Sequence, residues 1–287
     1  MRKILIGLAA LLVTGVAAVF AAGHILSSPA QTAIAVPGSL PGAVDVSLPV
    51  AHAPATRGWF IQGKDGKGAV LLLHGLRGNR LDMVDRARLF ASRGYSVLLI
   101  DLPGHGESKA EHITFGRNES KGVDAALRYL HDKLPGERIG VIGTSLGAAS
   151  FVFSAQDVPV AAVVLESMYP AIDEAVSDRL RLRLGSVGPY LAPLLLWQLP
   201  LQVGLQPQRL RPIDELAKIH APILIAAGTR DQHTTQTETR TIYSRANGPK
   251  MLWMVDGAAH VDLYSFDRTK YEQVVGTFLA NNLRSGA

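Results

Sequence analysis

Short apolar runs alternate with longer amphipathic stretches from residue 68 to the end of the chain. The short runs are rich in Val, Ile and Leu without polar interruptions, as in strands that helices cover on both faces. They predict strands at residues 69–73, 96–100, 139–142, 160–165, 222–227 and 251–255, with an earlier antiparallel strand at 59–62. Apolar residues at helical spacing predict helices at residues 80–93, 117–134, 146–156 and 269–283. This order predicts an α/β fold with a mainly parallel, doubly wound sheet.

Residues 171–211 break this alternation. The stretch is dense in Leu and Pro and lies between two predicted strands. Because a loop of this length inside a compact domain is usually functional, we interpret it as an inserted cap, and its apolar side chains suit a lipophilic substrate. The alternative is one ordinary crossover helix whose leucines pack on the core.

The chain begins with two positive charges, Arg2 and Lys3, followed by an uncharged apolar run over residues 4–22. The run is long enough to cross a bilayer, so we interpret residues 1–23 as a signal anchor, or as a signal peptide cleaved near Ala21. A buried N-terminal helix is the third alternative. Residues 24–54 are rich in Ala, Pro, Ser and Gly and predict a linker, which leaves one folded domain at 55–287. We expect this domain outside the cytoplasm, membrane-anchored or else secreted.

Composition narrows the possible functions. Among the 287 residues, 47% are hydrophobic and 18% are charged, which is typical of a folded protein. The net charge of +5 comes from scattered Lys and Arg, so we expect no nucleic-acid partner. There is no Cys, which excludes disulfides, thiolate metal ligands and a cysteine nucleophile.

The strongest chemical signal is Gly143-Thr144-Ser145-Leu146-Gly147, which follows a predicted strand and opens a predicted helix. This is the G-x-S-x-G nucleophile elbow, in which a tight turn leaves no room for side chains at the two glycines. The turn places Ser145 at the positive end of the helix and directs the Leu146 N–H toward a developing oxyanion. Ser145 is therefore the candidate nucleophile.

A serine hydroxyl needs a base, and the base needs a carboxylate that orients it. Asp231 and His260 each follow a late predicted strand, in the chain order Ser, acid, His that this elbow requires. Three rivals stay open. Glu166 lies at the end of another strand, Asp262 could be the acid or a helix cap, and His233 could be the base.

The second oxyanion donor should come from the loop after the first core strand, and we select the Leu76 N–H. His74 in the same loop is interpreted as structural, since no further ligands follow at metal-site spacing. We expect neither a metal nor a cofactor.

Five motifs in this order resemble the α/β-hydrolase superfamily, and within it the monoacylglycerol-lipase-like and serine-aminopeptidase-like group near the membrane-anchored Bem46-type hydrolases. They cover about residues 59–283 and are Leu72-Leu73-His74-Gly75, residues 101–108, the elbow, Gly228-Thr229-Arg230-Asp231 and Gly257-Ala258-Ala259-His260. The resemblance implies a hydrolase fold with a short cap, the triad of Ser145, Asp231 and His260, and an oxyanion hole at Leu76 and Leu146. It also implies that residues 101–108, with His105, form a structural turn. Thr144 departs from the larger residue that related sequences often carry.

We therefore expect a serine hydrolase that cleaves carboxylic esters, with an amphiphile such as a lysophospholipid or monoacylglycerol as the small-molecule substrate. The same residues could cleave amides or peptides, because only the leaving group differs. A catalytically silent binding scaffold is the third possibility. The sequence leaves the substrate, the role of the cap and the oligomeric state open.

Overall fold

An eight-stranded sheet forms the centre of the molecule within residues 2–155 and 157–284, which the computed structural model describes. Its strands are β2 Val44–Val50, β3 Ala53–Ile61, β4 Ala69–Leu73, β5 Ser96–Ile100, β7 Ile139–Thr144, β8 Ala162–Glu166, β9 Ile223–Gly228 and β10 Lys250–Val255. They are ordered β10-β9-β8-β7-β4-β5-β3-β2. The pairs from β10 to β5 are parallel, and β3 is antiparallel to both β5 and β2. The predicted α/β fold with a mainly parallel sheet is confirmed.

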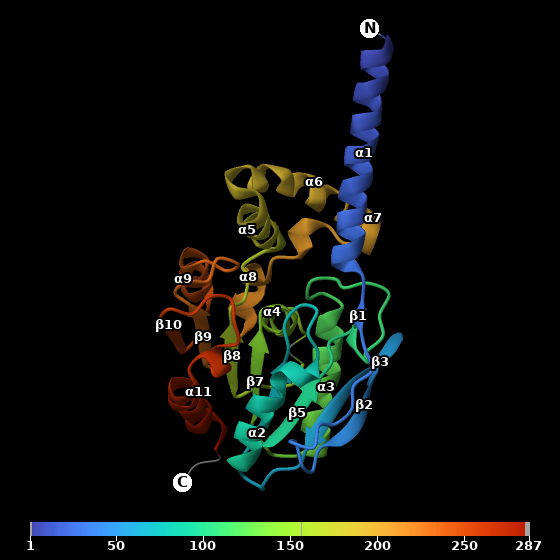
Figure 1. Cartoon of the computed structure of the whole chain (residues 1–287). Coiled ribbons are helices and arrows are strands. Elements are labelled where there is room, and N and C mark those ends of the chain that lie inside the picture. Colours follow the sequence, from blue (N-terminus) through green and yellow to red (C-terminus); the bar gives the residue numbers. More distant parts are fainter. Residues whose placement is uncertain (1, 156, 285–287) are drawn as a thin grey trace.

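Helices cover both faces of this sheet (Figure 1). They are η1 Arg80–Met83, α2 Val84–Ser92, α3 Glu119–Lys133, α4 Leu146–Val152, α9 Gln236–Arg245, α10 Leu263–Phe266 and α11 Arg268–Leu283. Strand β4 is fully buried, and successive side chains point to opposite faces. Leu71 and Leu73 join an apolar cluster with α3, α4 and α9, whereas Val70 and Leu72 join a cluster with α2 and α11. This double burial explains why the strands lack polar positions.

Helix α9 covers the sheet but was not predicted from the sequence. Its turns are polar, and only Thr239 and Ile242 are buried. It begins at a capping box, in which the Thr235 hydroxyl accepts from the Glu238 N–H and the Glu238 carboxylate accepts from the Thr235 N–H. The spacing T-x-x-E was therefore the signal in the sequence.

Three of the predicted segments, 1–23, 146–156 and 55–287, begin or end at residues that the structure does not describe. These residues are Met1, Gln156 and residues 285–287.

Residues 24–54 were expected to be a linker, but parts of this segment form strands that pair with the folded domain. Strand β1, Ala30–Gln31, pairs in parallel with β6, His105–Gly106, and β2 forms one edge of the main sheet. Leu48 and Val50 of β2 are buried between exposed neighbours, a period of two that indicates a half-covered strand. Pro49 is tolerated because β2 is an edge strand.

Residues 171–211, predicted as an inserted cap and called the cap from here on, are mostly helical. They contain α5 Ile172–Leu184, η2 Gly185–Leu191, α6 Ala192–Trp197, α7 Leu199–Val203 and η3 Pro207–Arg209, followed by α8 Pro212–Glu215 and η4 Leu216–Lys218. The cap follows the carboxyl end of β8 and lies beside α1, Arg2–Ser27 (Figure 1). It has a small core of its own around Ile172, Leu199 and Leu210, whereas Leu194, Trp197 and others stay exposed. Its leucines therefore do not serve mainly to cover the sheet.

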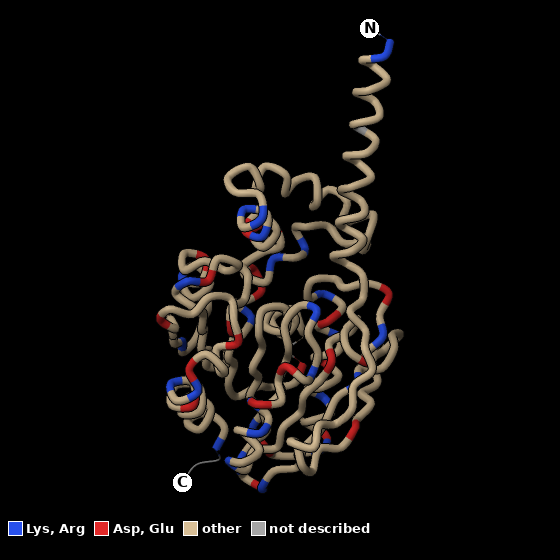
Figure 2. Tube along the Cα trace, viewed as in Figure 1, with Lys and Arg blue, Asp and Glu red and all other residues tan. Residues whose placement is uncertain are grey.

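Helix α1 extends away from the folded domain (Figure 1). It has 26 residues, a mean hydropathy of 2.6 in its most apolar window, and side chains that are mostly exposed. Figure 2 shows charge at its free end, from Arg2 and Lys3, and none along the rest of its length. By length and composition it is the helix among the described residues that could cross a membrane.

Candidate active site

Ser145 stands in a strained turn between β7 and α4. Its φ is 51° and its ψ is −108°, a conformation that a residue with a Cβ rarely adopts. A Cβ on Gly143 would lie 2.6 Å from the Ala148 nitrogen, and one on Gly147 would lie 2.5 Å from the Leu73 oxygen. The two glycines thus allow the close approach that the elbow requires. The Ser145 N–H donates to the Glu166 carbonyl oxygen at 2.7 Å, which holds the turn against β8.

Asp231 and His260 form a hydrogen bond although 29 residues separate them. Asp231 follows β9, His260 follows β10, and Nδ1 of His260 lies 2.8 Å from Oδ2 of Asp231. The other oxygen of Asp231 accepts the N–H groups of His233 and Thr234 at 2.8 and 2.9 Å. Burial alone would raise the pKa of Asp231, but the hydrogen bond and charge of His260 and these two N–H donors lower it below its usual value. The carboxylate is therefore ionised and fixed in orientation at neutral pH.

Ser145 and His260 line the same cavity, which we call the site cavity. Its volume is about 390 Å³, and its wall includes Gly75, Leu76 and His233. Ser145 is almost fully buried and the His260 side chain is 22% exposed, so the cavity is their common access to solvent. The structure thus brings the candidate nucleophile and the candidate base to one opening.

The rival acids Glu166 and Asp262 both bind Arg86 of α2. Arg86 Nη2 donates to Glu166 at 2.7 Å, and Nη1 donates to Asp262 at 2.5 Å. Glu166 also accepts from the Tyr271 hydroxyl at 2.5 Å and from the Thr144 hydroxyl at 3.0 Å. Asp262 in addition caps α10 by accepting the Ser265 N–H. These bonds explain both carboxylates structurally, and the pairing of Arg86 across 80 and 176 residues was invisible in the sequence.

His233, the rival base, lies beside His260, with 5.0 Å between the ring centroids. Burial, followed by the charges of Arg179 and His260, lowers the pKa of His233, so its ring is neutral at neutral pH. His233 binds Asp231 only through its backbone N–H. The ring that is hydrogen-bonded to the other oxygen of Asp231 is that of His260. The geometry therefore favours His260 as the oriented base.

The loop after β4 lies against the elbow. A Cβ on Gly75 would stand 3.8 Å from Cβ of Ser145, and Leu76 lines the site cavity. His74 accepts the Leu102 N–H at Nε2 at 3.0 Å, and its Nδ1 lies 2.7 Å from the Gly75 carbonyl oxygen. Burial, with the nearby His105, lowers the pKa of His74 to about 3 and keeps the ring neutral. His74 thus ties this loop to the segment that follows β5.

Arg179 of α5 is a residue that the sequence analysis missed. It lines the site cavity, and it also lines a second, apolar cavity that contains Ser145. Its Nη1 donates to the Ala175 carbonyl oxygen at 2.8 Å, within its own helix. The sequence offered no signal for it, because the cap had no recognised pattern.

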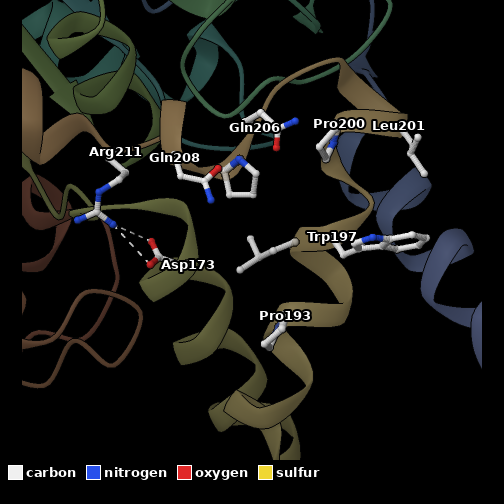
Figure 3. Close-up of a pocket in the computed structure, with 10 residues that line it drawn as sticks. Asp173, Pro193, Trp197, Pro200, Leu201, Gln206, Gln208 and Arg211 are labelled. Atoms are coloured by element: carbon white, nitrogen blue, oxygen red, sulfur yellow. Dashed lines mark hydrogen bonds and ion pairs between the residues drawn. The ribbon is translucent and has the colours of Figure 1, made fainter.

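A cavity of about 620 Å³ in the cap, which we call the outer cavity, is larger than the site cavity. Figure 3 shows Trp197, Pro200 and Leu201 on one side and the ion pair of Arg211 with Asp173 on the other. It is lined by neither Ser145 nor His260, so its volume alone does not make it a reaction site.

Among residues 2–155 and 157–284, no three His, Asp or Glu side chains converge as metal ligands.

The fold is that of the α/β hydrolases. The chain belongs to the alpha/beta hydrolase family, whose profile matches residues 70–274. It is 31% identical over 231 residues to the uncharacterized protein Rv2307c of Mycobacterium tuberculosis, covering 78% of this chain and 74% of that protein. It is 24% identical over 242 residues to the uncharacterized protein YqkD of Bacillus subtilis, covering 82% and 78%.

Solved structures share the fold. The esterase Pf2001 of Pyrococcus furiosus superimposes with a TM-score of 0.74 at 23% identity, over 90% of this chain and 98% of that one. A structure described as a membrane phospholipase A, a bacterial virulence factor, superimposes with a TM-score of 0.59 at 19% identity, over 98% and 99%. At these identities the likeness concerns the fold.

Proposed function

We propose that this protein is a serine hydrolase that cleaves carboxylic esters through an acyl-enzyme. The observation that carries the proposal is that the strained Ser145 and His260 line one cavity. Nδ1 of His260 is hydrogen-bonded to the ionised Asp231, which leaves Nε2 free to act on Ser145. Nucleophile, base and orienting carboxylate are the three parts that acyl transfer by serine requires.

In this mechanism His260 Nε2 accepts the proton of Ser145 Oγ as the oxygen attacks the ester carbonyl carbon. The tetrahedral intermediate collapses when His260 returns the proton to the leaving alcohol, which leaves an acyl group on Ser145. Water, deprotonated by His260, then attacks the acyl carbon. The second tetrahedral intermediate collapses as His260 returns this proton to Ser145 Oγ and the acid is released. Asp231 keeps the proton of His260 on Nδ1 and stabilises the imidazolium that forms in each step.

The oxyanion is proposed to bind the N–H groups of Leu76 and Leu146. Leu146 is the first residue of α4, where N–H groups have no partner within the helix. Leu76 follows Gly75, which approaches Ser145 closely, and both leucines line a cavity with Ser145. Two such donors stabilise the negative charge that develops on the substrate oxygen.

The test of this proposal is a substrate panel on the purified full-length protein. We expect labelling by a fluorophosphonate probe and turnover of acyl esters, with aminoacyl amides cleaved at least about tenfold more slowly because the amine is a poorer leaving group. Faster cleavage of the amides would replace the esterase by an amide hydrolase. An absence of both labelling and turnover would refute the hydrolase mechanism and favour a binding scaffold.

We also propose that α1 remains attached as a membrane anchor and is not removed as a signal peptide. Gln198 and Gln202 of the cap donate to the carbonyl oxygens of Val19 and Phe20, at 2.7 and 3.2 Å. Cleavage after Ala21 would remove both acceptors, and the Gln198 amide nitrogen would lose its hydrogen bond to Val19. The intact mass of protein extracted from the membrane fraction should correspond to a chain that keeps α1. A soluble protein that begins near Ala22 would contradict the anchor.

A further inference from the structure

Ser145 opens onto two different cavities. On one side is the site cavity with His260, and on the other is an apolar cavity that we call the inner cavity. The cap side of the inner cavity is formed by Val176, Leu195, Leu196 and Leu199, and its floor by Leu146. Because an acyl-enzyme must hold the acid part of its substrate beside the serine, an apolar cavity at this position suits a hydrocarbon chain.

Part of the wall of the inner cavity comes from α1. Gly23 and Leu26, near the end of the apolar helix, line it together with Leu76 and Ser145. The anchor segment is thus part of the cavity that contains the nucleophile, although the two are more than 100 residues apart in the chain.

Contacts on two sides hold this end of α1 in place. On the cap side, Gln198 is fully buried and bonds to Val19, and a Cβ on Gly23 would lie 2.3 Å from the Gln198 side chain. The rings of Phe20 and Trp197 pack edge to face, with centroids 6.0 Å apart. On the other side, the Arg77 guanidinium donates to the Ile25 and Ser28 carbonyl oxygens at 3.1 and 3.3 Å. These contacts specify one position of the helix end relative to Ser145.

We propose that the inner cavity is the acyl-chain subsite, and that α1 is a wall of this subsite as well as an anchor. This inference rests on the proposed esterase function and names its substrate class, esters of a fatty acid whose first carbons fill the inner cavity, which has a volume of about 80 Å³. The acyl chain of the substrate enters the inner cavity from the membrane that α1 is proposed to cross. Residues at the end of this helix line the cavity, so the helix connects the cavity to the lipid. Shorter acids leave the cavity unfilled and are held by the site cavity alone.

The rest of a longer acyl chain would have to pass Leu196 to reach the outer cavity. Leu196 lines both the inner and the outer cavity and therefore lies between them. The outer cavity combines apolar walls at Trp197 and Leu201 with polar groups at Gln206 and Arg211 (Figure 3). Shortening Leu196 should connect the two spaces and extend the subsite.

The test compares acyl-chain lengths in full-length protein purified in detergent. Leu26→Trp fills the inner cavity from the α1 side, so we expect kcat/KM for a p-nitrophenyl decanoate to fall at least about tenfold while that for p-nitrophenyl acetate changes less than about twofold. Leu5→Trp is the matched control, because Leu5 is exposed on the same helix and lines neither cavity with Ser145. It should leave both values unchanged.

A second variant keeps the proposal testable if Leu26→Trp fails to fold. Leu196→Ala should shift the preferred ester toward longer chains, measured as the ratio of kcat/KM for hexadecanoate to decanoate esters. Measurement of this ratio in mixed micelles and in phospholipid vesicles tests the route, and we expect the vesicles to give the larger shift. Equal effects on short and long chains in both variants, or no effect in either, would overturn the subsite. A wild-type protein without esterase turnover or probe labelling would instead refute the proposed function itself.

Discussion

Replacement of Ser145 by Ala is expected to lower kcat for ester hydrolysis by about 10⁴- to 10⁶-fold and to abolish fluorophosphonate labelling. The reason is that the acyl-enzyme pathway is lost as a whole, while substrate binding and the oxyanion donors remain. Stopped assays with an activated ester, together with gel detection of the probe, measure both effects. KM should change little, because the hydroxyl contributes mainly to the transition state.

Ser154→Ala is a suitable control for this variant. Ser154 lies just beyond the end of α4, the helix that Ser145 begins, and its hydroxyl donates to the Phe151 carbonyl oxygen at 2.6 Å. We expect near wild-type turnover, since Ser154 lines neither of the cavities that contain Ser145. Labelling that persists in Ser145→Ala would show that another residue is the nucleophile.

Asp231→Asn is expected to lower kcat about 10⁴-fold with little change in the free energy of unfolding. An asparagine amide can donate to Nδ1 of His260 and so stabilise the tautomer that cannot accept the proton of Ser145 at Nε2. A kinetic assay combined with urea unfolding separates the two quantities. A loss of turnover that only parallels a loss of folded protein would contradict an orienting role.

Glu166→Gln should give the opposite result. Glu166 is buried and shares Arg86 with Asp262, so removing its charge leaves the Arg86 guanidinium with one carboxylate partner. We expect the free energy of unfolding to fall by about 3 kcal/mol and kcat per folded molecule to stay within about threefold of wild type. If Glu166→Gln abolished turnover and Asp231→Asn did not, the role of the acid would pass to Glu166.

The core of the fold could be predicted because its signals are local. Continuous Val, Ile and Leu in β4 and β5 indicate strands that are covered on both faces, and the structure has these strands at the predicted residues. Strand β2 was hidden in a segment whose Ala, Pro and Ser suggested a linker, because only the pairing with β3 makes it a strand. Propensity is a weak guide at a sheet edge, where tertiary contacts decide.

The candidate site was predictable to the extent that it depends on turn chemistry. The steric need for Gly143 and Gly147 around a strained serine leaves a motif in the sequence, and the order of Asp231 and His260 follows from the strand order. Arg86 and Arg179 could not be found in this way. Arg86 reaches Glu166 and Asp262, and Arg179 reaches the site cavity, each from a helix whose position depends on packing. A lone arginine in a helix carries no sign of the residues it will meet.

The sequence by itself determined the class of fold, the candidate nucleophile and the apolar character of α1, since each follows from a pattern within a few neighbouring residues. The tertiary structure decided which carboxylate faces His260, because Arg86 binds Glu166 and Asp262 but not Asp231. It also decided that the end of α1 lines a cavity with Ser145. Contacts between residues more than 100 positions apart depend on how helices pack on the sheet, and no local pattern records them.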